Sequence, residues 1–291
     1  MPVFFVDVSA LKIGIERMDN QTRQFKLKET FNAAAAGYDS PALRFFVYAA
    51  DRLADCMALV GTEHILDVAC GTGAVSLACA ERLGQGQVTG VDLSEGMLEK
   101  ARAKAALRQL DNVSFQCADL QSMDFGAEAF DGACCGFGVF FLPDMEAAFR
   151  IVARHVRPGG AIGISSFTGA VMEPLAAAFI DRIQGFGVDI PPLSWKRLDD
   201  SAKHQALYAS AGISQVTTQA AQVGYDLTGF DEWWDILWFS GFRGMLNQLS
   251  ASELAQFRQE HRAEVERYAT DEGIWLNVEA LISVGHKLQA A

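Results

Sequence analysis

The sequence predicts an α/β fold in which helices cover both faces of a mostly parallel sheet. Three observations predict it. From His64 onward, short apolar runs alternate with helical segments, which is typical of strand–helix–strand units. The first run ends in a glycine turn, Gly71–Gly73. The chain has 291 residues, of which 50% are hydrophobic, so it can bury a sizeable core.

Seven short apolar segments are predicted as strands. In chain order they are His64–Ala69, Gln87–Asp92, Asn112–Cys117, Phe130–Cys135, Ala161–Ser166, Ile213–Gln222 and Gly273–Gly285.

Helices are predicted between these strands. They span Gly73–Leu83, Ser94 to about Arg108, Asp144–His155 and Asp199–Ala211. The hydroxyl of Ser94 can accept free N–H groups at the start of its helix. The run from Arg157 to Gly160 is a stop signal for the third helix, and Gly212 is expected in the left-handed conformation that ends the fourth. Lys100, Lys104 and Arg108 recur every fourth residue and predict a solvated helix face.

Charge and cysteine content narrow the classes of partner. With 24 Lys and Arg against 36 Asp and Glu, the formal net charge is -12, which argues against nucleic acid and anionic membrane surfaces. The six cysteines include no CxxC pair and no Cys/His run at metal spacing, so no metal site is expected. Free cysteines and the lack of a signal peptide or membrane-spanning segment predict a cytoplasmic protein.

The turn after the first strand predicts a ligand site. Glycine at Gly71 and Gly73 permits a tight turn and a ligand close to the backbone, and the following helix directs free N–H groups there. A dinucleotide fingerprint needs a third Gly or Ala, but Ser76 occupies that position. Asp67 at the strand tip would repel a pyrophosphate by about 4 kcal/mol at 4 Å and an effective dielectric of 20. A carboxylate attracts positively charged groups instead. S-adenosylmethionine carries an ammonium and a sulfonium, so Asp67 favours this cofactor.

Two further acidic residues are expected to belong to the same cofactor site. Asp92 ends the second strand about twenty residues past the glycines, where a carboxylate can accept both hydroxyls of a ribose. Asp119 ends the third strand, where it could receive an adenine amino group. Leu120 and Met97 are expected against the adenine ring, although simple core packing explains them about equally well.

The motifs together resemble a known family. The run ILDVACGTG at Ile65–Gly73, the run VTGVDLS, the Ala118-Asp119 pair and RPGG before the fifth strand are similar to class I S-adenosylmethionine-dependent methyltransferases over roughly His64–Phe167. The segment from Phe31 to Asp39 and the run from Phe130 to Gly138 resemble the ubiquinone/menaquinone-biosynthesis C-methyltransferase group. The resemblance implies a Rossmann-like seven-stranded methyltransferase sheet, with a helical cap inserted before the last strand.

The resemblance also implies site residues. It implies binding roles for Thr72, Asp92, Asp119, Leu120 and Gly136, and it implies that Tyr38 folds over the cofactor. The full set predicted to bind S-adenosylmethionine is Tyr38, Asp67, Ala69, Gly71, Thr72, Gly73, Asp92, Leu93, Met97, Asp119, Leu120 and Gly136. The chain departs from that group at Val139–Leu142, which is apolar, and in the insert Leu227–Thr270.

The domain organisation follows from these assignments. Residues 61–226 and 271–291 are expected to form the cofactor-binding domain, with a helical, aromatic cap at 227–270. Residues 18–60 are expected as an N-terminal helical segment over the cofactor site. Met18 begins a polar, helix-like stretch, so residues 1–17 are a possible N-terminal extension.

The predicted function is methyl transfer to a small, apolar or aromatic acceptor. Such an in-line displacement mainly requires correct positioning. A general base is needed only for some acceptors, and none is assigned among His155, His204, His261 and His286; His204, next to Lys203, is expected to be solvated. The predicted acceptor-binding residues are Trp234, Trp238, Phe242 and Arg243.

Two alternatives remain open from the sequence. One is an NAD-dependent oxidoreductase built on the same glycine turn, and the other is a non-catalytic module that binds S-adenosylmethionine. The oligomeric state is not indicated by any pattern.

Overall fold

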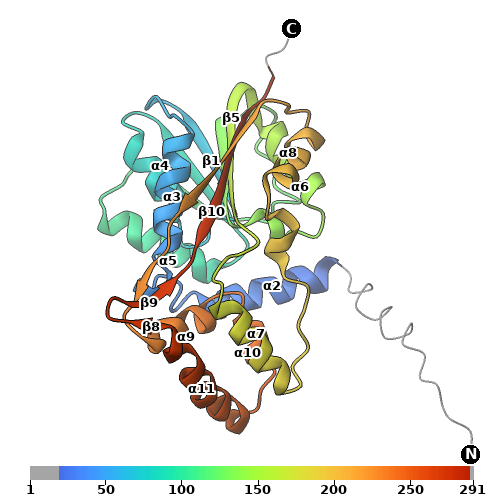
Figure 1. Ribbon diagram of the computed structural model, residues 1–291. Helices are drawn as coiled ribbons and strands as arrows, with labels where there is room; N and C mark the ends of the chain where they lie inside the picture. The colour runs from blue at the N-terminus through green and yellow to red at the C-terminus, as the bar shows by residue number, and fades with distance from the viewer. Residues whose placement is uncertain (1–19, 289–291) are drawn as a thin grey trace, which may run out of the picture.

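A seven-stranded sheet forms the centre of the computed structural model, which describes residues 20–288 (Figure 1). Its strands are β1 (His64–Val68), β2 (Gln87–Asp92), β3 (Val113–Cys117), β4 (Phe130–Gly136), β5 (Val156–Phe167), β6 (Val216–Gln222) and β10 (Glu279–His286). The spatial order is β3-β2-β1-β4-β5-β10-β6; β10 pairs antiparallel with both β5 and β6, and the other strand pairs are parallel. The order reverses between β1 and β4, which leaves a crevice at the carboxyl ends of these strands. The predicted fold class is confirmed.

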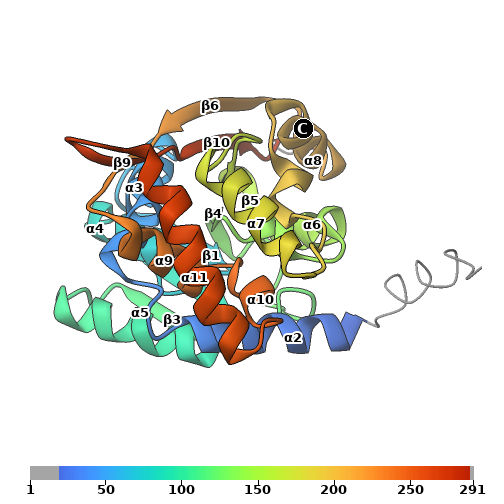
Figure 2. The same cartoon turned by 60° about the horizontal axis from the view of Figure 1, so that its bottom comes forward.

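Helices cover both faces of this sheet. On one face lie α3 (Phe45–Cys56), α4 (Ala74–Arg82) and α5 (Glu95–Leu107); on the other lie α6 (Met145–His155) and α8 (Ser201–Ser210) (Figure 1, Figure 2). The predicted helix ends are confirmed where a local signal fixes them. Ser94 Oγ accepts a hydrogen bond from the Met97 N–H at the start of α5. Gly212, with φ of 76°, follows the end of α8.

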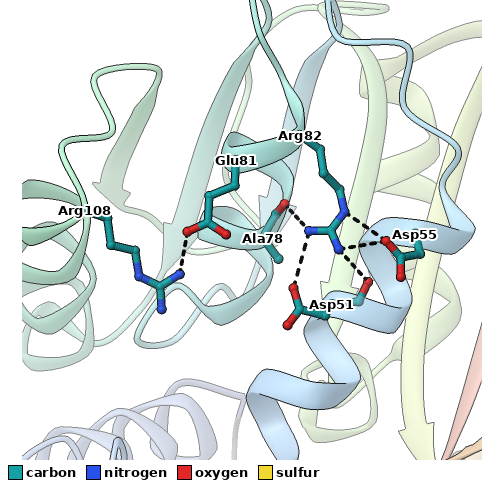
Figure 3. A network of polar contacts seen from close by, with 6 residues as sticks. All are labelled: Asp51, Asp55, Ala78, Glu81, Arg82 and Arg108. Atoms are coloured by element: carbon teal, nitrogen blue, oxygen red, sulfur yellow. Dashed lines mark hydrogen bonds and ion pairs between the residues drawn. The ribbon is translucent and has the colours of Figure 1, made fainter.

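An arginine on α4 ties the helices of the first face together (Figure 3). The Arg82 guanidinium contacts the carboxylates of Asp51 and Asp55 on α3, at 3.4 and 2.7 Å. Arg108, just after α5, contacts Glu81 on α4 at 2.8 Å. These ion pairs are partly solvated and therefore add little to the free energy of unfolding. Their main effect is to fix the positions of α3, α4 and α5 relative to one another.

The start of β5 differs from the prediction. The helix α6 ends at His155 as expected, but the strand begins at Val156, so the run Arg157–Gly160 belongs to the strand. The Gly159 N–H donates to Lys287 O at 2.7 Å, and the Lys287 N–H donates to Gly160 O at 3.0 Å. A Cβ on Gly160 would lie 2.4 Å from Asp131 O. The two glycines therefore allow close backbone approach inside the sheet, in addition to following the end of the helix.

The predicted last strand, Gly273–Gly285, is wrong as a single element. Its first part is β9 (Gly273–Leu276), which pairs with β7 (Tyr225–Leu227) and β8 (Ala269–Thr270) in a separate three-stranded sheet. Its second part is β10. The break lies at Asn277 and Val278, where Asn277 O accepts from the Met172 N–H and Val278 O from the Val223 N–H. An apolar run indicates that a strand is buried, but it does not indicate with which sheet the strand pairs.

A cap of helices gathers beyond the strand ends (Figure 1). From the predicted insert it takes α9 (Phe230–Phe239), α10 (Arg243–Leu246) and α11 (Ala251–Val265). It also includes α7 (Leu175–Gly185), an element that the sequence pattern did not indicate. Arg182 on α7 contacts the carboxylates of Glu260 and Glu264 on α11, and the Phe179 and Phe257 rings lie 5.7 Å apart.

The N-terminal segment lies between the sheet and the cap. It comprises α2 (Asn20–Ala34) and the short 3-10 helix η1 (Pro41–Leu43), followed by α3. The helix α2 packs on α5, and η1 packs on α9. The possible extension at residues 1–17 lies outside the described residues. Within the described part of the chain, no helix combines the length and apolarity needed to cross a bilayer.

Candidate functional site

The turn between β1 and α4 holds several residues in the left-handed backbone region. The φ angles of Ala69, Gly71 and Gly73 are 53°, 54° and 84°. A non-glycine residue in this region carries strain of the kind found at binding sites. A Cβ on Gly71 would meet nothing within 4 Å, whereas one on Gly73 would lie 3.0 Å from the Ala101 Cβ. Gly71 therefore borders open space, and Gly73 lets α4 approach α5.

Asp67 is fully buried at the end of β1 and lacks a cationic partner. Its Oδ2 accepts a hydrogen bond from Ser76 Oγ at 2.5 Å, and its Oδ1 has no partner in the described part of the chain. Burial is the main cause that raises the pKa of this carboxyl to about 7, and nearby Asp92 adds to it. Such a site favours a ligand that brings a positive charge.

Asp92 is fixed at the end of β2 by two backbone groups. Its Oδ2 accepts from the Gly71 N–H and its Oδ1 from the Ser94 N–H, both at 2.8 Å. Burial raises the pKa of this carboxyl as well, although these N–H groups oppose the shift. A carboxylate has about four lone-pair directions, so both oxygens can still accept hydroxyls.

A cavity opens at the carboxyl ends of β1, β2 and β4, with about 900 Å³ of empty space that includes open solvent; we call it the strand-end cavity. Predicted residues in its wall are Tyr38, Ala69, Gly71, Asp92, Leu93, Met97, Asp119, Leu120 and Gly136. Residues that the sequence interpretation missed include Phe31, Gln121, Phe137, Phe141 and Leu142. Phe31 lies in a segment singled out by resemblance, but nothing local marks its ring as part of a cavity wall.

A second cavity lies beside the glycine turn, and it brings in Asp67 and Thr72. We call it the glycine-turn cavity. Every predicted cofactor residue thus borders one of the two cavities, except Gly73.

Thr72 takes part in a polar cluster. Its Oγ1 donates to Asp39 Oδ1 at 2.8 Å, and Lys104 Nζ lies 2.6 Å from that oxygen and 3.0 Å from the Thr72 hydroxyl. The predicted solvated face is confirmed for Lys100 and Arg108, which are exposed, but not for Lys104, which is half-buried. Burial lowers the pKa of Lys104, and its pairing with Asp39 opposes the shift. The four-residue spacing on α5 gives no information about Asp39, which is 65 residues away.

A third cavity, the aromatic cavity, adjoins the strand-end cavity and has about 760 Å³ of empty space. Phe31, Tyr38, Phe137 and Phe141 border both. Its remaining rings are Phe45, Phe46, Phe140, Phe167, Trp195 and Phe242. The Phe137 and Phe167 rings stack at 4.3 Å, and the Tyr38 and Phe46 rings at 5.1 Å. Among the described residues of its wall there is no Asp, Glu, Lys, Arg or His.

The four predicted acceptor-binding residues are not brought together in a cavity wall. Phe242 borders the aromatic cavity. Trp234 and Trp238 stack on each other at 6.2 Å and border none of the three cavities. Arg243 Nη1 donates to Ala33 O at 2.8 Å, and its guanidinium lies over the Trp238 ring, so it joins the cap to α2.

None of the four histidines considered as a base borders these cavities. The prediction that His204 is solvated is wrong: its side chain is fully buried and hydrogen-bonds to Ser166 and Ser283 on β5 and β10. His261 is buried in the cap and accepts from Trp233 Nε1 at 2.9 Å. His155 is buried behind the sheet, and His286 is exposed.

Comparison with known proteins points to one kind of enzyme. Residues 65–160 match the family described as methyltransferase domain. The chain is 34% identical to aklanonic acid methyltransferase of Streptomyces sp. (strain C5) over 62% of its own length and 83% of that protein. It is 37% identical to nocamycin O-methyltransferase of Saccharothrix syringae, covering 50% of this chain and 51% of that one. A ubiquinone/menaquinone biosynthesis C-methyltransferase of Yersinia enterocolitica is 28% identical over 57% of this chain and 68% of its own. The chain thus spans about half of one of these relatives and more of the other two.

Solved structures share the fold. The YcgJ protein of Bacillus subtilis superposes with a TM-score of 0.57 at 20% identity, covering 84% of this chain and 99% of that one. A phosphoethanolamine N-methyltransferase 2 of Haemonchus contortus, solved in complex with S-adenosyl-L-methionine, gives 0.52 at 16% identity, covering 83% of this chain and 53% of that one.

Proposed function

Because this chain belongs to the family of S-adenosylmethionine-dependent methyltransferases, we propose that it methylates a small, mostly apolar aromatic acceptor. The observation that carries the proposal is the aromatic cavity. It shares four ring-bearing wall residues with the strand-end cavity and has no charged side chain among the described residues of its wall. An uncharged, ring-lined space favours a flat, apolar ligand.

The residues around the glycine turn fit the cofactor. S-adenosylmethionine supplies a methyl group on a positively charged sulfonium. Asp67, with its buried and unpartnered Oδ1, suits the positive charge of the methionyl part. Asp92 would accept the ribose hydroxyls, and Met97 and Leu120 would flank the adenine in the strand-end cavity.

The wall of the aromatic cavity offers no general base. Tyr38 is its one titratable side chain among the described residues, and burial raises the pKa of its hydroxyl, so the neutral form persists at physiological pH. The chain's contribution is therefore to orient the acceptor and exclude water. We expect the acceptor to lose its proton to solvent, as an acidic phenol or enol can.

Loss of the acceptor's proton to solvent predicts how the rate of methylation depends on pH. With S-adenosylmethionine saturating at every pH, the midpoint of kcat/KM for a series of phenolic acceptors should move with the pKa of each phenol, because no enzyme base intervenes. A midpoint that stays fixed across the series would show that a side chain takes the proton.

Two measurements test the function itself. Isothermal titration should show micromolar binding of S-adenosylmethionine and S-adenosylhomocysteine and no comparable binding of NADH. Label from methyl-labelled S-adenosylmethionine should then appear on members of a panel of phenols and quinones. Methylation confined to charged aliphatic amines would contradict the proposed acceptor class.

A further inference from the structure

Trp195 in the aromatic cavity has a polar group without a partner. Trp195 is part of the cavity wall, and its Nε1 is buried and contacts no acceptor in the described part of the chain. Indole N–H can only donate. A buried donor without an acceptor costs free energy, so most such groups are paired with protein, water or ligand.

Hydrogen bonds fix the backbone segment that carries this ring. Trp195 lies in the 3-10 helix η3 (Ser194–Leu198). Arg197 in the same helix donates to Phe140 O at 2.9 Å and to Leu142 O at 2.6 Å, which fixes η3 against the neighbouring cavity wall. Ser166 Oγ donates to Leu198 O at 2.5 Å and anchors the other end of η3 on β5. A donor held in this way loses little conformational entropy when a ligand binds.

The surroundings of Trp195 restrict what can pair with it. The Phe242 ring lies 5.8 Å away at an angle of 63°, and Pro191, Pro192 and Met245 complete the nearby apolar wall. No charged side chain stands in the described wall to neutralise an ion. A neutral oxygen on a flat ring system satisfies the N–H, while its rings pack on the phenylalanines.

We propose that Trp195 is a specificity-determining residue of the acceptor site, and that its indole N–H donates a hydrogen bond to a carbonyl or hydroxyl oxygen on a planar, uncharged ring system. This inference deepens the proposed function and rests on it. The acceptor class is thereby narrowed to fused or linked aromatic rings that carry such an oxygen.

A matched pair of ligands tests this inference without turnover. Fluorenone and fluorene have the same three-ring outline and neither ionises, but only fluorenone has a carbonyl oxygen. Isothermal titration of the full chain, saturated with S-adenosylhomocysteine, should give about five- to tenfold tighter binding of fluorenone. In Trp195→Phe this preference should disappear, while the affinity for fluorene changes less than twofold.

Trp275→Phe is the control, because this tryptophan is 45% exposed on β9, away from the cavity, and its loss should leave both affinities unchanged. A preference that survives in Trp195→Phe would overturn the inference and indicate that water satisfies the indole. Absence of binding of either ligand to the wild type would also overturn it. If S-adenosylhomocysteine itself does not bind, the proposed function is contradicted, and this outcome is distinguishable from a failure of the Trp195 inference.

Discussion

At the scale of single residues, Asp67 and Asp92 end neighbouring strands but differ in what their oxygens contact. The Asp92 oxygens each accept a backbone N–H, whereas one oxygen of Asp67 has no partner in the described structure. The first arrangement presents a fixed carboxylate to neutral hydroxyls. In the second, burial keeps the carboxyl protonated below about pH 7, and a cationic ligand would stabilise its ionised form.

Asp92→Ala should weaken S-adenosylhomocysteine binding at least tenfold, because hydrogen bonds to a charged acceptor contribute about 1.5–3 kcal/mol. Titration calorimetry measures the change, with circular dichroism to confirm folding. Asp92→Asn keeps one acceptor oxygen and should lose less. Unchanged affinity in the alanine variant would refute the ribose role.

Cofactor affinity should depend on pH through Asp67. With a pKa of about 7 in the free protein, this carboxyl is protonated at lower pH and must lose its proton before it can attract a cation. Affinity for S-adenosylmethionine should therefore rise as the pH increases to about 7 and level off above it. Titrations from pH 5.5 to 8.5 test this, and Asp67→Asn should bind more weakly with a flatter profile. A flat wild-type profile would argue against Asp67 as the partner of the positive charge.

At the scale of elements, the contact between the N-terminal segment and the cap depends on a glycine. A Cβ on Gly37 would lie 2.3 Å from the Phe239 ring on α9. The next residue, Tyr38, borders all three cavities. The shape of the three cavities therefore depends on how closely α9 packs against the segment that carries Tyr38.

Gly37→Ala should displace either the Phe239 ring or the segment around Tyr38, and so weaken S-adenosylhomocysteine binding several-fold. Phe239→Ala removes the clash, so the double variant should bind better than Gly37→Ala alone. A double-mutant cycle with the two single variants measures the coupling, expected at about 0.5–3 kcal/mol. Strictly additive effects would show that the two residues act independently.

At the scale of the whole molecule, a buried histidine joins the sheet to α8. His204 hydrogen-bonds to Ser166 and Ser283 at 2.7 Å each, and Ser283 also contacts Thr218 on β6. Burial lowers the pKa of His204 to about 4. In the unfolded chain this pKa is about 6.5, so acid favours the unfolded state.

Between pH 6.5 and 4, His204 should therefore lower the free energy of unfolding by on the order of 3 kcal/mol, whereas Asp67 and Asp92, whose pKa values burial raises, act in the opposite direction over the same range. Urea unfolding at pH 7.5, 5.5 and 4.5 measures it. His204→Asn keeps Asp67, Asp92 and His261, so the difference between wild type and variant isolates His204. The variant should be less stable at neutral pH, and this difference should shrink as the pH falls towards 4. Equal slopes for variant and wild type would contradict the assignment.

The local sequence determined the parts of this protein that depend on neighbours in the chain. The strand before Gly71, the turn itself, the Ser94 cap and the acidic residues at strand ends all follow from hydrophobic period, glycine and capping chemistry. The tertiary structure alone decided the rest. It moved Gly273–Leu276 into a second sheet, added α7 to the cap, buried His204 and paired Lys104 with Asp39. It also placed Phe242 in the aromatic cavity but Trp234 and Trp238 outside it. These outcomes depend on contacts between residues far apart in the chain, and aromatic residues in a helix have the same local pattern whether they line a cavity or fill a core.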